Sequence, residues 1–252
     1  WPTEVKKWSQ FSHLRVAVLH GPTKEAALQS DADIYVVNPE GLDWLLGAVK
    51  QRYSVVTADR RTGIVAPRKR VKVAVDVKAF AAMGFDTLVI DELSKFKHTG
   101  TARFKALKQV LPTFKRRWGL TGSPAANGLM DLFGQCYVLD MGKALGPYIT
   151  RFQMTYFNRG WNGYSWELKE GAEQVIYRQI GDLALRVGNE VLDMPELVHH
   201  AVRVQLPPKV MLLYRKLERG LLLGLDSGTV TAATAAALSM KCRQVSSGAV
   251  YL

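Results

Sequence analysis

Short apolar runs alternate with stretches of helical periodicity along the first 145 residues. Apolar runs of four or five residues, each closed by turn or capping residues, predict strands at 15–19, 34–37, 87–90 and 117–121. Between them, apolar side chains recur every three or four residues and predict helices at 23–29, 41–50, 76–83, 103–111 and 129–139. Alternating strands and helices build parallel sheets, so we expect an α/β fold whose parallel sheet is flanked by helices.

Two segments depart from this alternation. Residues 51–75 place Val-rich pieces on either side of a turn-rich basic segment, which predicts a hairpin or a loop. From residue 146 the pattern becomes mostly helical, interrupted by an aromatic, Gly-rich insert at 156–166 and by an expected strand at 197–204. We therefore expect two parts, residues 1–145 and a helical extension at 146–252.

Composition places the chain among ordinary globular proteins. Of its 252 residues, 48% are hydrophobic and 22% charged, and its two cysteines are too few for a disulfide framework or a four-thiolate metal site. No apolar run is long enough to cross a bilayer, and no signal-peptide pattern opens the chain. We expect a cytoplasmic protein without a membrane partner.

The net charge of +12 points to a polyanionic partner, with nucleic acid as the leading candidate. Residues 95–117 carry eight basic side chains and no acidic one, and a solvated surface explains such a run equally well. A second basic cluster lies between residues 60 and 72. If the first run binds DNA, the expected phosphate contacts are Lys95, Lys97, Lys105, Lys108, Arg116 and Arg117.

Chemistry-bearing residues follow two of the expected strands. Asp91 and Glu92 come directly after the apolar run at 87–90, and in open α/β sheets ligands bind beyond the carboxyl ends of strands. Adjacent carboxylates there suit a nucleotide site, where the first holds Mg²⁺ through water and the second activates the attacking water. Taken alone, a solvated, helix-capping acidic pair is the simpler reading.

The second strand end strengthens the nucleotide interpretation. Thr121, Gly122, Ser123 and Pro124 place two hydroxyl groups in a tight loop, a geometry that can sense a phosphate or the acidic pair. We expect Gly122 to provide a backbone conformation closed to larger residues and Pro124 to fix the exit angle of the loop.

Two further candidates are weaker. His199 and His200 would point to opposite faces of the expected strand at 197–204, so one metal ion could not easily bind both. The aromatic insert at 156–166 could stack on bases, but such aromatic residues more often close a small satellite core.

The order of three motifs resembles the Swi/Snf-like branch of superfamily-two helicases and translocases, phage members above all. The motifs are IYVVNPE at 34–40, VIDELSKFK at 89–97 and WGLTGSPAANGLMDLF at 118–133. The third is the most specific of them. The resemblance covers essentially the whole chain and implies a RecA-like motor domain, with residues 146–252 leading toward a second motor domain.

The resemblance also implies roles for individual residues. Asp91 corresponds to the carboxylate that holds Mg²⁺, Glu92 to the residue that activates water for ATP hydrolysis, and residues 121–124 to a loop that couples nucleotide state to DNA contacts. Asn38 lies where the family touches the nucleic-acid backbone, although it could equally cap a helix. Lys97 matches a recurrent Lys of the family that follows the acidic box. ATP and Mg²⁺ are the implied cofactors.

The chain departs from the family in two essential parts, a phosphate loop and a second motor domain with its arginine finger. No G-x-x-x-x-G-K-[ST] phosphate loop occurs in it, and the weak echo at 140–144 lacks the hydroxyl residue. We therefore expect a piece of a longer DNA-dependent ATPase, inactive alone, that translocates on or remodels duplex rather than single-stranded DNA. Replication, recombination or repair proteins stay open as further partners. The alternative is a non-catalytic DNA- or protein-binding module. A metal-dependent nuclease is disfavoured, because no further carboxylate cluster follows a neighbouring strand.

Overall fold

The computed structural model describes residues 1–58, 65–161, 163, 165–187, 198–220, 222–225, 228–231 and 234–249. The chain divides into two compact units, Trp1–Val187 and Gly188–Leu252. The boundary predicted at residue 145 falls inside the first unit, and the assignment of a motor domain and an extension on either side of it stays a prediction. None of the helices in the described ranges is long and apolar enough to span a membrane.

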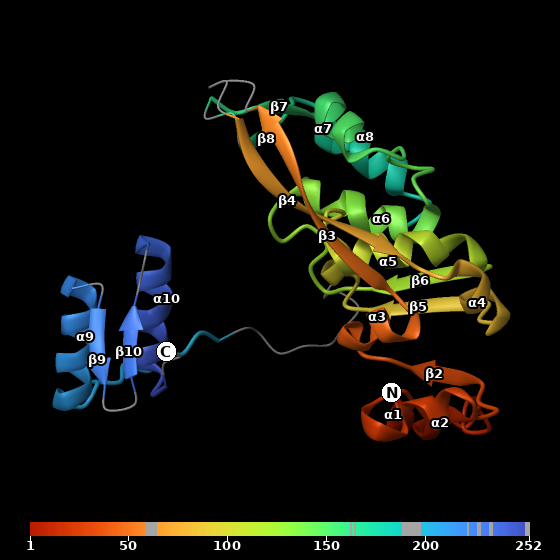
Figure 1. Ribbon diagram of the computed structural model, residues 1–252, viewed down its shortest axis with the longest axis horizontal. Coiled ribbons are helices and arrows are strands. Elements are labelled where there is room, and N and C mark those ends of the chain that lie inside the picture. Colours follow the sequence, from red (N-terminus) through yellow and green to blue (C-terminus); the bar gives the residue numbers. More distant parts are fainter. Residues whose placement is uncertain are drawn as a thin grey trace. The chain divides into compact units, whose positions relative to one another are not determined.

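The first unit combines parallel strand pairs with short helices, as Figure 1 shows. Its strands are β1 (Val16–Val18), β2 (Ile34–Val36), β3 (Val49–Ala58), β4 (Val65–Ala74), β5 (Thr87–Asp91), β6 (Arg116–Leu120), β7 (Phe157–Arg159) and β8 (Trp166–Leu168). Its helices are α1 (Pro2–Lys7), α2 (Lys24–Leu28), α3 (Leu42–Leu45), α4 (Val77–Ala82), α5 (Ala102–Val110), α6 (Leu132–Asp140), α7 (Ile149–Tyr156) and α8 (Ala172–Ile180).

Two parallel pairs confirm the expected α/β class. β1 pairs with β2 and β5 with β6, each through a helical crossover, and the antiparallel pairs are β3–β4 and β7–β8. The β5–β6 pair is only partly covered: Ile90 is buried, but Val89, Trp118 and Leu120 are each at least half exposed. The run at 87–90 is therefore a strand buried on one face only.

Two apolar clusters hold the first unit together. The larger joins α3, α5, β4 and β5 around Phe80, Phe104 and Leu107. The smaller packs α6 against α7 and α8, with Phe133, Phe152 and Ile176 at its centre. Tyr156, Phe157 and Trp166 of the aromatic insert join this second cluster, which confirms the satellite-core interpretation for those three residues. The interpretation is wrong for Trp161, which is 92% exposed. Tyr164 lies outside the described residues.

Several predicted elements are corrected. The helix expected at 41–50 is only the single turn α3, because Gly47 takes a left-handed φ of 55° and Val49 already pairs with Ala74. Of the two alternatives for residues 51–75, the hairpin is confirmed, because β3 pairs with β4 in antiparallel register. The strand expected at 197–204 is absent over the described residues 198–204, and His199 and His200 are exposed.

The second unit contains α9 (Pro208–Gly220), the antiparallel strands β9 (Leu222–Leu225) and β10 (Gly228–Thr231), and α10 (Ala235–Ser246). α9 packs against α10 through Leu217, Cys242 and Val245, each of which is less than a tenth exposed. α10 begins at the N-cap residue Thr234, whose hydroxyl accepts a hydrogen bond from the Ala237 N–H at 3.1 Å.

Candidate functional site

The carboxyl ends of β5 and β6 meet at one edge of the parallel pair. Asp91 is in register with Leu120, so Glu92 and Thr121 follow neighbouring strands at the same level. Both carboxylates are exposed, and Asp91 Oδ1 accepts a hydrogen bond from the Glu92 N–H at 3.0 Å. The structure thus brings the acidic pair and the start of the predicted coupling loop to one edge, as parallel strands require.

Glu92 has an unusual backbone. Its φ and ψ are 57° and 58°, the left-handed region, which is costly for a residue with a Cβ. A 3₁₀ turn at Leu93–Phe96 follows, and Ser94 Oγ lies 3.4 Å from Glu92 Oε2. Backbone strain of this kind concentrates at functional sites, because only a surrounding structure that fixes the residue can maintain it.

The loop after β6 contains an orphaned hydroxyl. Thr121 Oγ1 is buried and has no hydrogen-bond partner among the described residues, whereas Ser123 and Pro124 are exposed. Gly122 does not do what the sequence suggested: its φ is not positive, and a Cβ there would meet no described atom within 4 Å. The left-handed turn of this loop is at Gly128, with φ of 102°.

Asp131 fastens this loop to the segment after the acidic pair. Its Oδ2 accepts hydrogen bonds from Lys97 Nζ at 2.9 Å and from both the backbone N–H and Nδ2 of Asn127 at 3.2 Å. Gln135 Nε2 donates to the Pro124 and Asp131 carbonyls at 2.6 and 2.9 Å. The two loops that follow β5 and β6 therefore share one buried polar cluster.

The electrostatics of this cluster favour a charged Asp131. Burial raises the pKa of its carboxyl, but hydrogen bonds from Lys97 and Asn127 outweigh this, so the pKa lies below its ordinary value. The side chain of Asp131 is 7% exposed and that of Lys97 20%, so the ion pair is partly shielded from solvent.

Two glycines allow the segment after the acidic pair to approach its neighbours closely. A Cβ on Gly134 of α6 would lie 2.5 Å from the carbonyl oxygens of Phe96 and Lys97. On the other side, Gly119 of β6 packs against the Leu93 side chain. The turn at Leu93–Phe96 is thus held between β6 and α6.

With this geometry established, comparison with known proteins decides the family. Residues 1–247 match the family described as SNF2-related domain. The chain belongs to the SNF2-related domain family. The Swi/Snf-like resemblance of its motifs is thereby confirmed.

One curated relative of this SNF2-related chain is "Putative protein p41" of Acyrthosiphon pisum secondary endosymbiont phage 1, 29% identical over 264 residues. The match covers 100% of this chain but 51% of the relative, so the chain spans about half of that protein's length. A solved structure, "Sulfolobus solfataricus SWI2/SNF2 ATPase core in complex with dsDNA", matches 97% of this chain and 44% of that one, with 22% identity and a TM-score of 0.48.

The basic residues of the predicted DNA surface fall into two groups. Three of them make contacts inside the SNF2-related chain. Lys97 pairs with Asp131, and Lys105 Nζ donates a hydrogen bond to the Val71 carbonyl at 3.3 Å. Arg117 donates hydrogen bonds to the carbonyls of Leu111, Phe114 and Leu139. Their roles in DNA binding stay predictions, but each has a structural role of its own.

The remaining basic residues are exposed. Arg116 pairs with Asp86 at 3.3 Å, Lys108 Nζ lies 4.6 Å from the ring centre of Tyr137, and Lys95 pairs with no acidic side chain of the described part. Asn38 is exposed at an N-cap position, where its side chain makes no capping hydrogen bond. Capping therefore does not account for Asn38, and its predicted contact with DNA stays untested.

Sequence reasoning missed the cluster around Asp131. Asn127 and Asp131 lie four residues apart in the third motif, and this spacing could have indicated that their side chains meet. The role of Gln135 had no such signal, because it depends on contacts with backbone carbonyls.

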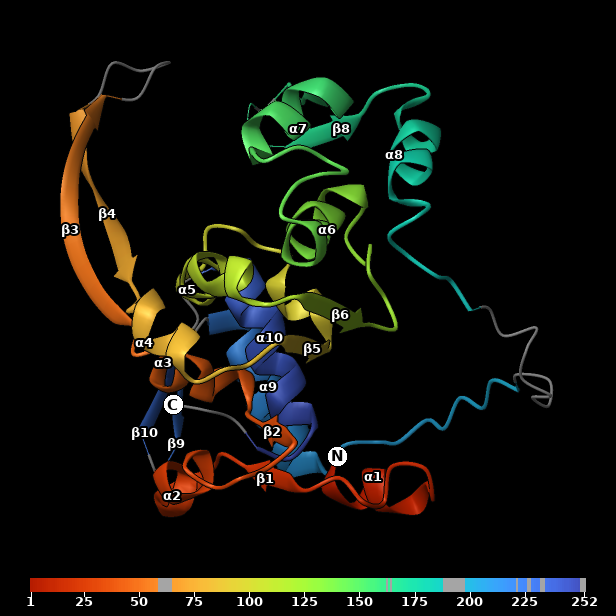
Figure 2. The same ribbon diagram turned by 90° about the vertical axis from the view of Figure 1, so that its right-hand side faces the viewer.

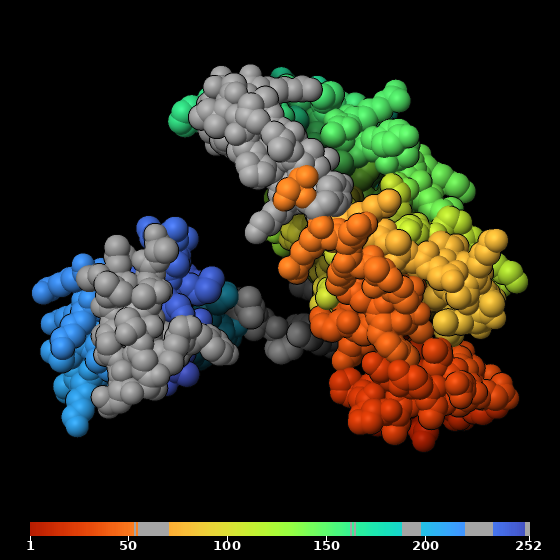
Figure 3. All heavy atoms as spheres, in the orientation of Figure 1, coloured from red at the N-terminus to blue at the C-terminus, as the bar shows by residue number. Residues whose placement is uncertain are grey.

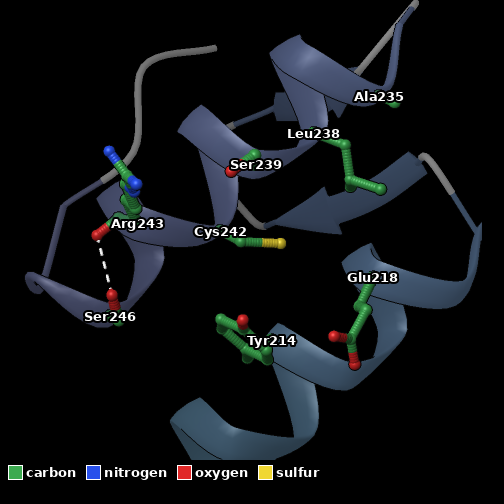
Figure 4. Close-up of a pocket in the computed structure, with 8 residues that line it drawn as sticks. All are labelled: Tyr214, Glu218, Ala235, Leu238, Ser239, Cys242, Arg243 and Ser246. Carbon is green, nitrogen blue, oxygen red and sulfur yellow. Dashed lines mark hydrogen bonds between the residues drawn. The ribbon is translucent and has the colours of Figure 1, made fainter.

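Two pockets lie away from this edge. One of about 280 Å³ lies among α2, α3 and α4 and includes Trp44, Asp76 and Phe80. The other, of about 330 Å³, lies between α9 and α10, where Cys242 faces Tyr214 and Glu218 (Figure 4). Neither pocket includes Asp91, Glu92 or Thr121.

Proposed function

We propose that the chain is part of a DNA-dependent ATPase of the Swi/Snf-like type, which couples hydrolysis of Mg-ATP to translocation on DNA or its remodelling. The observation that carries this proposal is the register of Asp91 with Leu120, which brings the acidic pair and the Thr121 loop to one strand edge. Membership of the SNF2-related family supports it. The net charge of +12 supports a polyanion such as DNA as the partner.

The residues at this edge suit Mg²⁺ that is shared with a nucleotide. Carboxylate oxygens are ligands that Mg²⁺ prefers, and in ATPase sites it binds through one or two carboxylates, waters and substrate phosphates. No group of three or more acidic, His or Cys side chains that could hold a metal occurs among the described residues, so a metal site built from protein ligands alone has no support there. Asp91 would hold Mg²⁺ through water, and the bound ion would neutralise charge on the phosphates.

Glu92 is suited to orient the attacking water and accept its proton. Its carboxylate is exposed, and its left-handed backbone sets its direction relative to Asp91. General bases contribute about 10²- to 10⁴-fold to a reaction rate. The Thr121 hydroxyl is buried without a hydrogen-bond partner, one residue past Leu120, which is in register with Asp91. It is therefore free to form a hydrogen bond when a nucleotide binds to the acidic pair.

The phosphate loop and an arginine finger would have to come from other parts of the whole protein, since phosphoryl transfer depends on them. For this chain alone we expect no ATP turnover.

The test is Glu92→Gln in the whole protein, with Glu173→Gln on the exposed face of α8 as a control of equal charge change. We expect DNA-stimulated ATPase to fall by about 10²-fold or more while ATP binding is kept. Near-normal turnover in Glu92→Gln would remove Glu92 from the catalytic residues. DNA binding by the unsubstituted protein without any ATPase would favour the non-catalytic module instead.

A further inference from the structure

The β3–β4 hairpin carries a concentration of charge that the proposed site does not use. Between residues 49 and 74 the chain has one acidic residue, Asp59, and eight basic ones: Lys50, Arg52, Arg60, Arg61, Arg68, Lys69, Arg70 and Lys72. Arg60 and Arg61 lie outside the described residues. About a quarter of all Lys and Arg of the chain thus falls within one supersecondary element.

The hairpin is long, and the contacts that fasten it lie at its base. Its strands pair over ten residues, from Val49 with Ala74 to Ala58 with Val65, so each extends about 34 Å. At the base, Val73 is buried in the larger core, and the Val73 carbonyl accepts a hydrogen bond from Gln109 Nε2 at 3.1 Å. Figure 2 shows the strands running on beyond α5, away from the helices of the first unit.

Alternation along β4 separates an anchoring face from a basic one. Val71 and Val73 pack on the core, so residues of the opposite parity belong to the other face of the ribbon. Lys72 is exposed, and Arg70 and Arg68 follow at every second position. Gln51, which is in register with Lys72, is exposed as well. Arg52, in register with Val71 on the anchoring face, is also exposed. In the space-filling view the described part of the hairpin lies at the surface (Figure 3). Lys50, in contrast, pairs with Asp43.

A basic two-stranded ribbon of this length fits duplex DNA. The major groove of B-DNA is about 12 Å wide and admits a two-stranded β-ribbon, and phosphates line both of its edges. Regularly spaced Lys and Arg with almost no acidic residue suit a continuous polyanion better than a protein surface of mixed charge.

We propose that the β3–β4 hairpin is a DNA-binding arm that grips the phosphates of duplex DNA without reading sequence, with Arg68, Arg70 and Lys72 as principal contacts. The proposal deepens the DNA part of the proposed function, because it names a surface for it. It does not require the chain to hydrolyse ATP, so the two can fail separately.

The experiment measures binding of the 252-residue chain to a labelled 30-base-pair duplex by fluorescence anisotropy between 50 and 200 mM salt. The test variant combines Arg68→Gln, Arg70→Gln and Lys72→Gln. The control combines Lys6→Gln, Lys78→Gln and Arg178→Gln, which remove the same charge from exposed sites on α1, α4 and α8. Circular dichroism and thermal unfolding check that both variants fold like the unsubstituted chain.

We expect the slope of log affinity against log salt to fall by about 0.9 for each phosphate that the test variant no longer neutralises, and affinity at 50 mM salt to fall at least tenfold. The control should keep the original slope. An unchanged slope in the test variant, an equal loss in the control, tighter binding to a single strand of the same length, or no binding by the unsubstituted chain would overturn the proposal. If the unsubstituted chain binds DNA and the test variant binds it with the same affinity and salt slope, the hairpin proposal fails. The proposed ATPase function is then unaffected.

Discussion

Lys97 Nζ and Asp131 Oδ2 lie 2.9 Å apart, although 34 residues separate them along the chain. The pair joins the turn after the acidic residues to the start of α6, and Asn127, in the segment after β6, donates to the same carboxylate oxygen. A displacement of one loop would therefore strain the other. This linkage gives the family motifs at 89–97 and 118–133 a physical connection.

Removal of Lys97 should destabilise the chain substantially. In Lys97→Met the Asp131 carboxylate stays buried but loses the cation that pairs with it. Loss of a partner costs about 3–5 kcal/mol in fully buried pairs and up to about 1 kcal/mol in exposed ones, so we expect about 2 kcal/mol for this partly shielded pair. Urea unfolding of the chain measures it.

Arg116→Ala is the matched control for this measurement. It breaks the exposed pair with Asp86, whose side chains are 62% and 48% exposed, and it should cost at most about 1 kcal/mol. Equal losses in the two variants would mean that burial does not distinguish the pairs.

The same pair predicts an acid-sensitive stability. The folded-state pKa of Asp131 is below its ordinary value, so its contribution is complete above the unfolded pKa, about 3.9, and is lost as pH falls through the folded value. Between pH 5.5 and 2.5 the unsubstituted chain should lose more unfolding free energy than Asp131→Asn, whose amide does not titrate. Parallel curves for the two chains would contradict this assignment.

Gly134 and Gly122 should respond oppositely to substitution. In Gly134→Ala the new Cβ would collide with the backbone of Phe96 and Lys97, and relief of such overpacking costs about 1–3 kcal/mol. Gly122→Ala meets no described atom and does not need a positive φ, so we expect a change within about 1 kcal/mol, in the stabilising direction. Thermal unfolding of both variants tests this contrast, and a large loss in Gly122→Ala would restore the conformational role that its motif suggested.

Glu92 should be replaceable by glycine at less cost than by alanine. A left-handed conformation costs about 1–2 kcal/mol for a residue with a Cβ and little for glycine, so Glu92→Gly should be more stable than Glu92→Ala by about 1 kcal/mol. Both variants lose the carboxylate, so the difference between them isolates the backbone. Equal unfolding free energies would show that φ at residue 92 is not strained.

The acidic pair and the loop after β6 were predictable because continuous apolar runs locate strands, and parallel strands deliver their carboxyl ends to one edge. The β5 and β6 predictions are confirmed to within a residue. The helix was expected at 41–50 because Leu45, Leu46 and Val49 have helical spacing. The prediction is wrong because Val49 pairs with Ala74 of β4. Tertiary pairing there outweighs local periodicity.

The strand expected at 197–204 failed for a different reason. Val198, Val202 and Val204 have strand-like spacing but are 69%, 82% and 80% exposed, and no described segment pairs with them. Within the site, the partner of Lys97 could not be predicted, because no local pattern records a contact across 34 residues. The exposed Lys95 and the internally bound Arg117 likewise look alike in a basic run, since only packing separates them.

The orphaned hydroxyl of Thr121 allows stability and coupling to be separated. Thr121→Val keeps the shape of the side chain and replaces the buried hydroxyl by a methyl group. Because a buried polar group without a partner costs about 1–3 kcal/mol, the chain should become more stable, by about 1 kcal/mol.

If the Thr121 hydroxyl serves only the fold, ATPase and translocation of the whole protein should be unchanged in Thr121→Val. If Thr121 couples the nucleotide site to DNA, stimulation of the ATPase by DNA should fall in a protein that is at least as stable as before. Melting temperature, ATPase with and without duplex DNA, and translocation are measured on this variant and, for comparison, on Ser123→Ala, which removes the exposed hydroxyl of the same loop. Unchanged DNA stimulation in Thr121→Val would end the coupling role of this residue, because no loss of folded protein could hide the effect.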